Sequence, residues 1–425
     1  MTEQRNIVVL GASVAGLQST HYIMKHILPA LKQHKKEAKY HVYLINPSPN
    51  WWFRPASPRV AASTTRMASE KILFDVRPGL AQYSKDDITF LEATATAVDD
   101  AARSVTYRLA GPSHSEETLP YHALIVATGS STHHPAFSMS GSTETTLSSI
   151  SLTNSQALTA KSIVIVGGGP TAVEFAGEVA EHLNGKPGWF STKTTKRKTN
   201  ITLITSSSSL LPALRPALAN TAASKLSSLG VDIIYNNRVV STSRVPGTER
   251  TQIQLAKGDR LEADLYVPAS GVSPNTSFLP PHLLDERKYL LTNPKTLRVD
   301  AANSPRVYAF GDVASYSRNC IPDIMFALPA LAVNLKRDLL AYDAKRPGEK
   351  PKGRDREYVR DERATQLVPL GTMGGVGEAM GWKLPSWVVW VLKGRDYMLG
   401  MSGAATASGD VVKKEIKWSR EEAVV

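Results

Sequence analysis

The stretch that most constrains the fold is KSIVIVGGGPTAVEFAGEVA, residues 161–180. Its opening run, residues 162–166, is apolar and β-branched, which is typical of a parallel strand covered on both faces. The next residues match the GxGxx[GA] pattern, in which a tight turn lets backbone N–H groups approach a pyrophosphate and a small residue lets helix and strand pack closely. The matching residues are Gly167, Gly169 and Ala172. Pro170 falls near the first helical position, where a missing N–H costs nothing. We therefore interpret the stretch as a dinucleotide site rather than a structural glycine turn.

A second unit of the same kind opens the chain. Residues 6–10 form an apolar strand pattern, and GASVAG, residues 11–16, follows it. The residues of this turn that we assign to a cofactor are Gly11, Ser13, Ala15 and Gly16. Ser13 stands where the pattern has its second glycine, but its small side chain still lets a phosphate approach. The next strand ends at Asn46, where an acidic residue would bind a ribose, and an amide oxygen can still accept that hydrogen bond.

The remaining segments continue an α/β pattern. Residues 88–110 alternate as two strands of a hairpin, and residues 132–150, rich in Ser and Thr, are interpreted as a linker. The strand 201–204 closes the unit that begins at residue 161. Thr205 follows it in place of the acid that favours NAD over NADP, so both nucleotides stay open.

Two further segments carry polar candidates. A strand pattern ends at Gly311 and Asp312, where the carboxylate can accept hydrogen bonds from sugar hydroxyls or cap the following helix. The Pro-rich loop NWWFRPASPRV, residues 50–60, holds Arg54 and Arg59. Either arginine could reach a cofactor phosphate, and the loop fits an aromatic anchor in the core equally well.

The composition narrows the function classes. The 425 residues suffice for two or three domains, and 42% hydrophobic residues support real cores. The net charge of +12 is dispersed, which favours a basic enzyme over a protein bound to nucleic acid or anionic lipid. The one cysteine, Cys320, excludes a CxxC redox pair and is expected to be a small buried apolar residue. We expect no membrane-spanning segment, no secretory signal and no myristoyl anchor, and we assign no metal ligands.

Five motifs occur in a fixed order: GASVAG at 11–16, ATGSS at 127–131, GGGPTAVE at 167–174, GVSPNT at 271–276 and YAFGDVA at 308–314. Together they resemble the two-dinucleotide flavin oxidoreductases of the pyridine-nucleotide–disulfide oxidoreductase superfamily. SPR at 57–59, LVPLGTMGGVG at 367–377 and LKGRDYM at 392–398 resemble its AMID-like, apoptosis-inducing-factor-homologous branch, which is related to the type II NADH dehydrogenases. The resemblance covers nearly the whole chain.

The resemblance implies an α/β fold of the glutathione-reductase type, with two Rossmann-like three-layer dinucleotide-binding domains and a small C-terminal α+β segment. Residues 1–150 and 271–345 would form the FAD-binding domain. Residues 151–270 would bind NADH or NADPH, and residues 346–425 would form an interface segment.

The same resemblance assigns individual residues to the cofactors. It places Asn46 at the adenosine ribose of FAD, Asp312 at the ribityl and phosphate part, and Glu174 near the nicotinamide and the flavin, where Glu174 could hold the carboxamide. The alternative for Glu174 is a solvated or capping helix residue. The complete set assigned to cofactor binding is Gly11, Ser13, Ala15, Gly16, Asn46, Arg59, Thr128, Gly129, Gly167, Gly169, Ala172, Asn275, Gly311 and Asp312.

The mechanism follows from the cofactors that the resemblance implies. Hydride passes directly from nicotinamide to flavin when the rings stack, so no catalytic triad is needed. Disulfide reductases of the superfamily use a cysteine pair beside the flavin, which this chain lacks, so electrons must leave to a diffusible acceptor. We predict an FAD-dependent NAD(P)H oxidoreductase with a quinone as acceptor. The alternatives are a redox-sensing signalling or DNA-binding flavoprotein, suggested by the basic loop 186–198, and an oxidoreductase of one specialised-metabolite pathway.

A short apolar patch near the C-terminus bears on membrane contact. Residues 387–392 are apolar and include two tryptophans, and the surrounding stretch 384–395 is bordered by Lys383 and contains Lys393 and Arg395. Tryptophan beside cations is typical of an interfacial helix. Six apolar residues fit a helix packed on the flavin domain equally well, and we favour that packing. We expect a cytoplasmic protein, with peripheral contact to an intracellular membrane through 384–395 as the second option, and the oligomeric state is left open.

Overall fold

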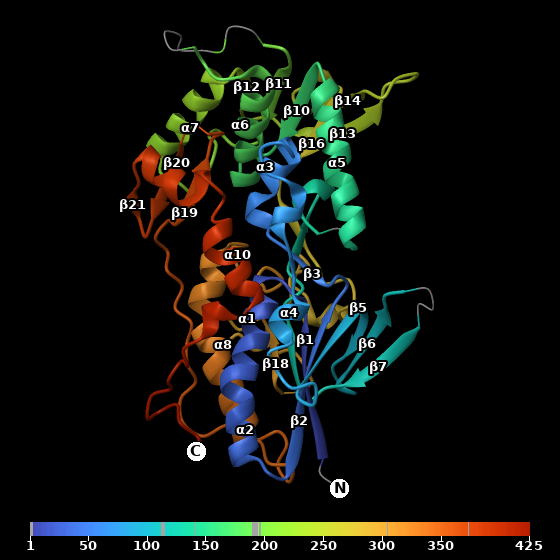
Figure 1. The fold of residues 1–425 in the computed structure, drawn as a ribbon, viewed down its shortest axis with the longest axis vertical. Coiled ribbons are helices and arrows are strands. Elements are labelled where there is room, and N and C mark those ends of the chain that lie inside the picture. Colours follow the sequence, from blue (N-terminus) through green and yellow to red (C-terminus); the bar gives the residue numbers. More distant parts are fainter. Residues whose placement is uncertain are drawn as a thin grey trace.

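The computed structural model describes residues 3–111, 115–139, 141–188, 194, 197–303, 305–372 and 374–425. Two α/β units are stacked along the long axis of the molecule (Figure 1). The C-terminal segment, orange to red, runs along one side of both units, from β19–β21 beside the second unit to the chain end beside the first (Figure 1). The C-terminal segment is therefore placed to contact both units.

The first unit is built on a seven-stranded sheet in the order β18-β8-β1-β2-β5-β6-β7. The strands from β18 to β5 are parallel, and β5, β6 and β7 are antiparallel. Its strands are β1 (Glu3–Leu10), β2 (Ala38–Asn46), β5 (Ile88–Asp99), β6 (Ser104–Leu109), β7 (Glu116–Pro120), β8 (Ala123–Val126) and β18 (Val307–Ala309). Its main helices are α1 (Val14–Tyr22), continued through residues 23–27 into α2 (Leu28–His34), and α8 (Ile321–Ala341). The predicted hairpin over residues 88–110 is confirmed.

The second unit has a parallel four-stranded sheet in the order β12-β11-β10-β16, beside an antiparallel sheet β13-β14-β15. The strands are β10 (Ser162–Val166), β11 (Asn200–Ile204), β12 (Val231–Ile234), β13 (Val239–Arg244), β14 (Thr251–Leu255), β15 (Arg260–Ala263) and β16 (Leu265–Pro268). The helices are α5 (Thr143–Thr159), α6 (Pro170–Asn184) and α7 (Pro216–Ser228). The predicted architecture, two Rossmann-like α/β units with parallel sheets, is confirmed.

Smaller elements connect and cover the two units. Strand β9 pairs with β17 where the chain leaves the first unit and returns to it. The C-terminal segment forms the sheet β19-β20-β21 and two helices. These elements are β3 (Asn50–Trp52), α3 (Ser57–Ala62), β4 (Leu73–Asp75), α4 (Arg77–Leu80), β9 (Ser130–Thr132), β17 (Val272–Pro274), β19 (Gln366–Pro369), β20 (Gly375–Ala379), β21 (Trp382–Lys383), α9 (Ser386–Val389) and α10 (Leu399–Ala407).

The interpretation of residues 132–150 as a linker is wrong from residue 143 onward, because α5 begins there. Ser142 caps this helix by accepting a hydrogen bond from the N–H of Thr145 at 3.2 Å. Hydroxyls within the helix donate to carbonyls four residues earlier, as Thr153 does to Ser149 at 2.7 Å, so the polar side chains are satisfied without leaving the helix. The helix also spans the proposed domain boundary at residue 150, and the domain division stays a prediction.

None of the helices in the described part of the chain combines the length and apolar character needed to cross a lipid bilayer.

Candidate functional site

The first glycine turn lies at the carboxyl end of β1. Gly11 has φ +100°, and a Cβ on it would lie 2.5 Å from the carbonyl oxygen of Ala127. A Cβ on Gly16 would clash with the carbonyl of Gly11. Both positions therefore require glycine so that α1 can start directly against the strand ends. The turn presents the N-terminus of α1 beside the neighbouring strand β8, the arrangement that suits a pyrophosphate.

Asn46, at the end of β2, is tied to this turn. Its Oδ1 accepts a hydrogen bond from the N–H of Ala12 at 2.9 Å, and its Nδ2 donates to the carbonyl of Ser48 at 2.7 Å. An aspartate could accept the first bond but could not donate the second. The amide therefore holds the phosphate turn against the next strand, and contact with a ribose stays a prediction.

Asp312 reaches the same turn from β18. Gly311, with φ +82°, has room for no side chain, because a Cβ would lie 2.9 Å from the Cβ of Ala15. The Oδ2 of Asp312 accepts a hydrogen bond from Ser130 at 3.1 Å and lies 3.5 Å from Nη1 of Arg54. Burial raises the pKa of Asp312, and the Arg54 guanidinium partly opposes this shift.

Arg54 is the arginine of the Pro-rich loop that lies beside this carboxylate. Its Nη1 donates to the hydroxyl of Ser130 at 3.0 Å, and burial lowers the pKa of its guanidinium. The sequence left Arg54 and Arg59 open as phosphate partners. The structure brings Arg54, but not Arg59, to the first nucleotide turn and Asp312.

The segments around Thr128 and Asn275 are bound to each other. Thr128 donates its hydroxyl to the carbonyl of Asn275 at 2.8 Å, and the Asn275 amide donates back to the carbonyl of Thr128 at 2.9 Å. The N–H of Asn275 donates to the carbonyl of Gly129 at 3.0 Å, and Ser131 donates to the Asn275 Oδ1 at 2.8 Å. Asn275 thus holds together the two segments that connect the units, and the adjacent Ser130 bonds to Asp312.

The second glycine turn lies at the carboxyl end of β10. Gly167 has φ +141°, and a Cβ there would lie 2.6 Å from the carbonyl of Ala269 and 3.2 Å from the Cβ of Ala172. Gly169 precedes Pro170 at the start of α6, and its Cβ position faces open space. That open space is where a phosphate can approach the backbone.

Helix α6 carries three carboxylates on one face, Glu174, Glu178 and Glu181, exposed by only 3%, 0% and 4%. The Oε1 of Glu174 lies 2.5 Å from Nζ of Lys393, which also donates to the carbonyl of Leu367 at 3.0 Å. Burial raises the pKa of Glu174 to about 7, and the ammonium of Lys393 partly opposes that shift. The pairing excludes the interpretation of Glu174 as a solvated helix residue.

Glu178 binds Arg59, the residue that the resemblance placed near the flavin. The Nη2 and Nε of Arg59 donate to Glu178 at 2.8 and 3.1 Å, and its remaining bonds go to the carbonyls of Gly394 and Arg395 at 2.7 and 2.9 Å. The hydroxyl of Tyr397 donates to the same carboxylate at 3.1 Å. Four donor contacts of Arg59 therefore join the first unit to α6 and to the C-terminal segment.

Glu181 is the third carboxylate on this face of α6; together with Glu174 and Glu178 it forms what we call the acidic stripe. Arg66 bridges Glu178 at 3.1 Å and Glu181 at 2.8 Å, and the N–H and hydroxyl of Thr372 donate to Glu181 at 2.7 and 2.6 Å. Sequence reasoning identified Glu174 but missed Glu178 and Glu181. The available signal was their i, i+4, i+7 spacing, which puts all three acids on one helix face.

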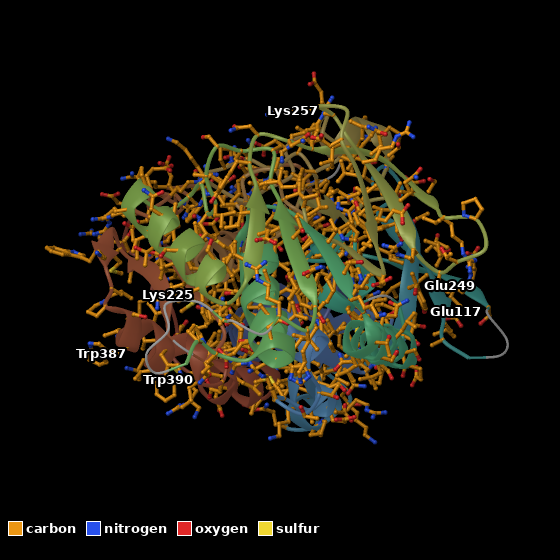
Figure 2. The ribbon with its side chains drawn as sticks, turned by 90° about the horizontal axis from the view of Figure 1, so that it is seen from above. Glu117, Lys225, Glu249, Lys257, Trp387 and Trp390 are labelled. Carbon is orange, nitrogen blue, oxygen red and sulfur yellow. The ribbon has the colours of Figure 1, made fainter. Side chains whose placement is uncertain are left out.

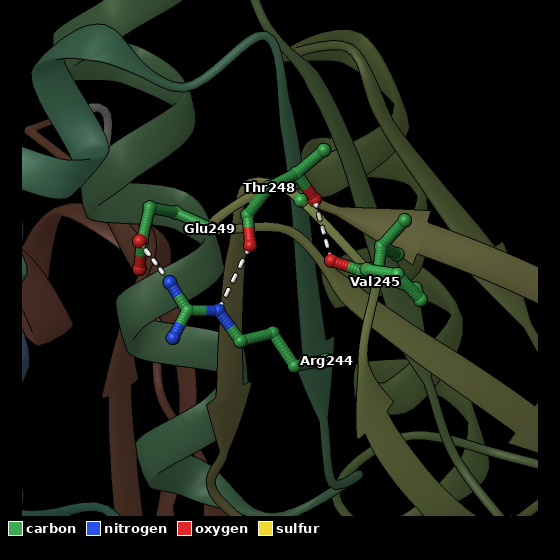
Figure 3. Close-up of a pocket in the computed structure, with 6 residues that line it drawn as sticks. Arg244, Val245, Thr248 and Glu249 are labelled. Carbon is green, nitrogen blue, oxygen red and sulfur yellow. Dashed lines mark hydrogen bonds and ion pairs between the residues drawn. The ribbon is translucent and has the colours of Figure 1, made fainter.

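The residues present fit the two predicted cofactors. The first turn exposes Ser13 and the second has open space at Gly169, so a phosphate has room at both, and the half-buried Asp312 offers an acceptor for hydroxyl groups. A hollow elsewhere, at the β13–β14 turn, is lined by six consecutive residues, 244–249 (Figure 3). It is bounded by the Arg244–Glu249 ion pair and a hydrogen bond from Arg244 to the carbonyl of Thr248 at 2.8 Å, and it contains none of the predicted site residues.

The comparisons with known proteins agree with this geometry. The family model of the pyridine nucleotide-disulphide oxidoreductases matches residues 5–333. The chain belongs to this family. That span includes both glycine turns, Asp312 and the whole acidic face of α6.

Individual relatives extend the similarity to the C-terminal segment. Oxidoreductase phnG of Penicillium herquei is 40% identical over 94% of this chain and 95% of its own length. External alternative NAD(P)H-ubiquinone oxidoreductase B3, mitochondrial, of Arabidopsis thaliana is 22% identical over 77% of this chain and 57% of its own length. The solved structure of NDH2 from Plasmodium falciparum in complex with NADH shares the fold, with a TM-score of 0.64, 15% identity and 97% coverage of both chains.

These findings confirm the resemblance drawn from the five motifs, including the relation to apoptosis-inducing factor and type II dehydrogenases. The predicted use of FAD and of NADH or NADPH is confirmed at the level of the family. The roles of the individual site residues stay predictions.

The basic loop receives no further support as a nucleic-acid site. Lys193 and Lys196 lie outside the described residues. Arg197 pairs with Asp232 at 2.9 Å, so its charge is partly neutralised.

Replacing Arg59 by Met should destabilise the protein by roughly 3 kcal/mol, because it leaves the Glu178 carboxylate buried with fewer partners. Chemical denaturation measures this effect, and Arg59→Met/Glu178→Leu should recover part of it. Arg77→Met, which breaks the exposed pair with Asp75, is the control and should leave stability nearly unchanged, because solvent screens that pair. A stable Arg59→Met protein that has lost FAD would instead show a direct role in cofactor binding.

Proposed function

We propose that the protein is an FAD-dependent oxidoreductase that takes hydride from NADH or NADPH and reduces a quinone. The observation that carries the proposal is the pair of nucleotide turns combined with the absence of a second cysteine in the sequence. Bound FAD would accept hydride from the nicotinamide and pass two electrons onward. Without a dithiol, the onward electrons go to a diffusible acceptor. The Arabidopsis relative, named for ubiquinone, supports a quinone as that acceptor.

Cys320 does not supply a relay. It precedes α8 as a single thiol, and burial raises its pKa to about 11. A thiol with that pKa stays protonated at neutral pH, and the thiolate is the reactive form.

The proposed binding roles follow the contacts. Asp312, Ser130 and Arg54 would hold the ribityl and phosphate part of FAD, with the turn at Gly11 on its pyrophosphate. The turn at Gly167 and Gly169 would hold the nicotinamide nucleotide. Asn275 would keep the segment at Thr128 in place between the two, and the packed interior would exclude water from the reaction.

Reduction of a quinone consumes one proton for each hydride that NAD(P)H supplies. Glu174 is the group suited to provide it, because its carboxyl is buried, lies on α6 and has a pKa of about 7. Lys393 fixes the orientation of the carboxyl through their 2.5 Å contact. We therefore assign Glu174 to proton transfer.

The C-terminal surface suits an acceptor drawn from a lipid phase. Trp387, Trp390 and Val391 are exposed by 69%, 38% and 43%, whereas Val389 is buried. Trp387 and Trp390 lie at one edge of the molecule (Figure 2). Helix α9 packs by one face against β19 and β20 of the C-terminal segment and presents tryptophans outward, which supports peripheral membrane contact.

The purified protein should be yellow, and NADH or NADPH should bleach it under anaerobic conditions. Asp312→Ala should weaken FAD binding about tenfold or more, because a charged hydrogen-bond acceptor is lost. Released FAD measured by fluorescence tests this, with Asp86→Ala, an exposed carboxylate elsewhere in the first unit, as control. A colourless protein that FAD cannot reconstitute would contradict the proposed function.

The quinone-reducing step should lose rate as the pH rises through about 7. The folded-state pKa of Glu174 is raised, so the carboxyl carries its proton below this value and loses it above. Glu174→Gln should be slower and should lose the inflection, measured by stopped-flow oxidation of pre-reduced protein. Glu249→Gln, at an exposed turn, should keep the wild-type profile. An unchanged inflection in Glu174→Gln would remove this residue from the proton path.

Vesicles of phosphatidylcholine and phosphatidylserine should bind the protein in co-sedimentation. Trp387→Ser/Trp390→Ser should lower the bound fraction about tenfold or more, because the apolar area of two tryptophans no longer enters the interface. Leu158→Ser removes an equally exposed apolar side chain from α5 and should leave binding unchanged. Equal binding of both variants would place the membrane contact elsewhere or nowhere.

A further inference from the structure

The end of β11 is where the second unit would meet the adenosine ribose of a nicotinamide nucleotide. Thr205 stands there, only 4% exposed. Its Oγ1 accepts a hydrogen bond from the N–H of Ser207 at 3.2 Å and would lie 2.5 Å from a Cβ on Gly168. The position therefore has no carboxylate to bind a free 2′-hydroxyl or to repel a 2′-phosphate, and its hydroxyl already serves the loop.

The loop that follows offers hydrogen-bond donors instead. Ser206 and Ser208 are exposed, and their hydroxyls form no hydrogen bond with the described part of the protein. The hydrogen bond from the N–H of Ser207 to Thr205 ties the loop between the two serines back to the end of β11. Two free hydroxyls beside a ribose match the acceptor oxygens of a phosphate.

The neighbouring strand adds a positive charge. After β12, the N–H of Asn236 donates to the carbonyl of Ser207 and that of Asn237 to the carbonyl of Thr205, both at 3.1 Å. These bonds hold the backbone that leads directly into Arg238 against the serine loop. Arg238 is exposed, and its guanidinium makes no ion pair or hydrogen bond to the residues that the structure describes. Arg215, at the far end of the same loop, is by contrast paired with Glu378.

We propose that the loop after β11 and the residues that follow β12 select NADPH over NADH, with Ser206, Ser208 and Arg238 forming the subsite for the 2′-phosphate. The inference rests on the proposed oxidation of a nicotinamide nucleotide and names which one. A phosphate of nearly two negative charges gains charge-assisted hydrogen bonds from Arg238 and the two hydroxyls, whereas a 2′-hydroxyl finds no anionic acceptor here.

Binding measured by calorimetry tests the subsite without any turnover. The holoprotein should bind 2′-phospho-ADP-ribose at least about tenfold more tightly than ADP-ribose, and Arg238→Ala should reduce that preference about tenfold. Arg260→Ala, an exposed arginine on β15 that bonds Gln254, is the matched control and should keep the preference. Equal affinity for the two ligands, or a preference that Arg238→Ala leaves intact, would overturn the proposal.

Kinetics provide the second test. The ratio of kcat/KM for NADPH to that for NADH should exceed about ten, and Ser206→Glu, which places a carboxylate on an exposed loop position, should reverse it. A ratio below one in the wild type would overturn the proposal. Failure of both nucleotides to reduce the flavin would refute the proposed function instead, and the calorimetric preference would still decide the subsite.

Discussion

Three buried carboxylates on one face of α6, Glu174, Glu178 and Glu181, connect this helix to the first unit and to the C-terminal segment. Glu178 alone accepts hydrogen bonds from Arg59, Arg66 and Tyr397, which come from the first unit and from the C-terminal segment. Buried charges are costly unless they are paired, and removing one partner of such a pair is strongly destabilising. The stripe is therefore satisfied only when the two nucleotide-binding units and the C-terminal segment are all in place.

Helix α6 begins at the second glycine turn. Pro170 starts α6 directly after Gly169, and the acidic stripe follows within the next three turns. Arg59 ties α6 to the first unit and Lys393 ties it to the C-terminal segment, so both contacts oppose movement of the turn at its N-terminus relative to Asp312. Two hydrogen bonds between Thr128 and Asn275 likewise hold together the two segments that connect the units. Hydride transfer requires that kind of alignment between two rings, and these contacts supply the rigidity.

Local sequence was enough to predict the parts of the fold that depend on neighbouring residues. The turns at Gly11 and Gly167 could be predicted because their positive φ and close backbone contacts require glycine whatever surrounds them. Arg59 could not be placed, because its partner Glu178 is 119 residues away and several acids compete for it. The helix over Thr143–Thr159 was missed for a related reason: its Ser and Thr residues favour turns unless, as here, their hydroxyls bond to carbonyls within the helix.

The pairing of Glu174 with Lys393 has a chemical consequence for the proposed reaction. When the carboxyl is protonated, the ammonium of Lys393, only 14% exposed, loses its negatively charged partner and keeps only neutral acceptors, the carboxyl oxygen of Glu174 and the carbonyl of Leu367. A buried cation in that state favours negative charge nearby, and a two-electron reduction creates negative charge that protonation then removes. The C-terminal segment would thus supply the Lys393 cation, and through its contact with Glu174 this cation would influence when the carboxyl releases its proton.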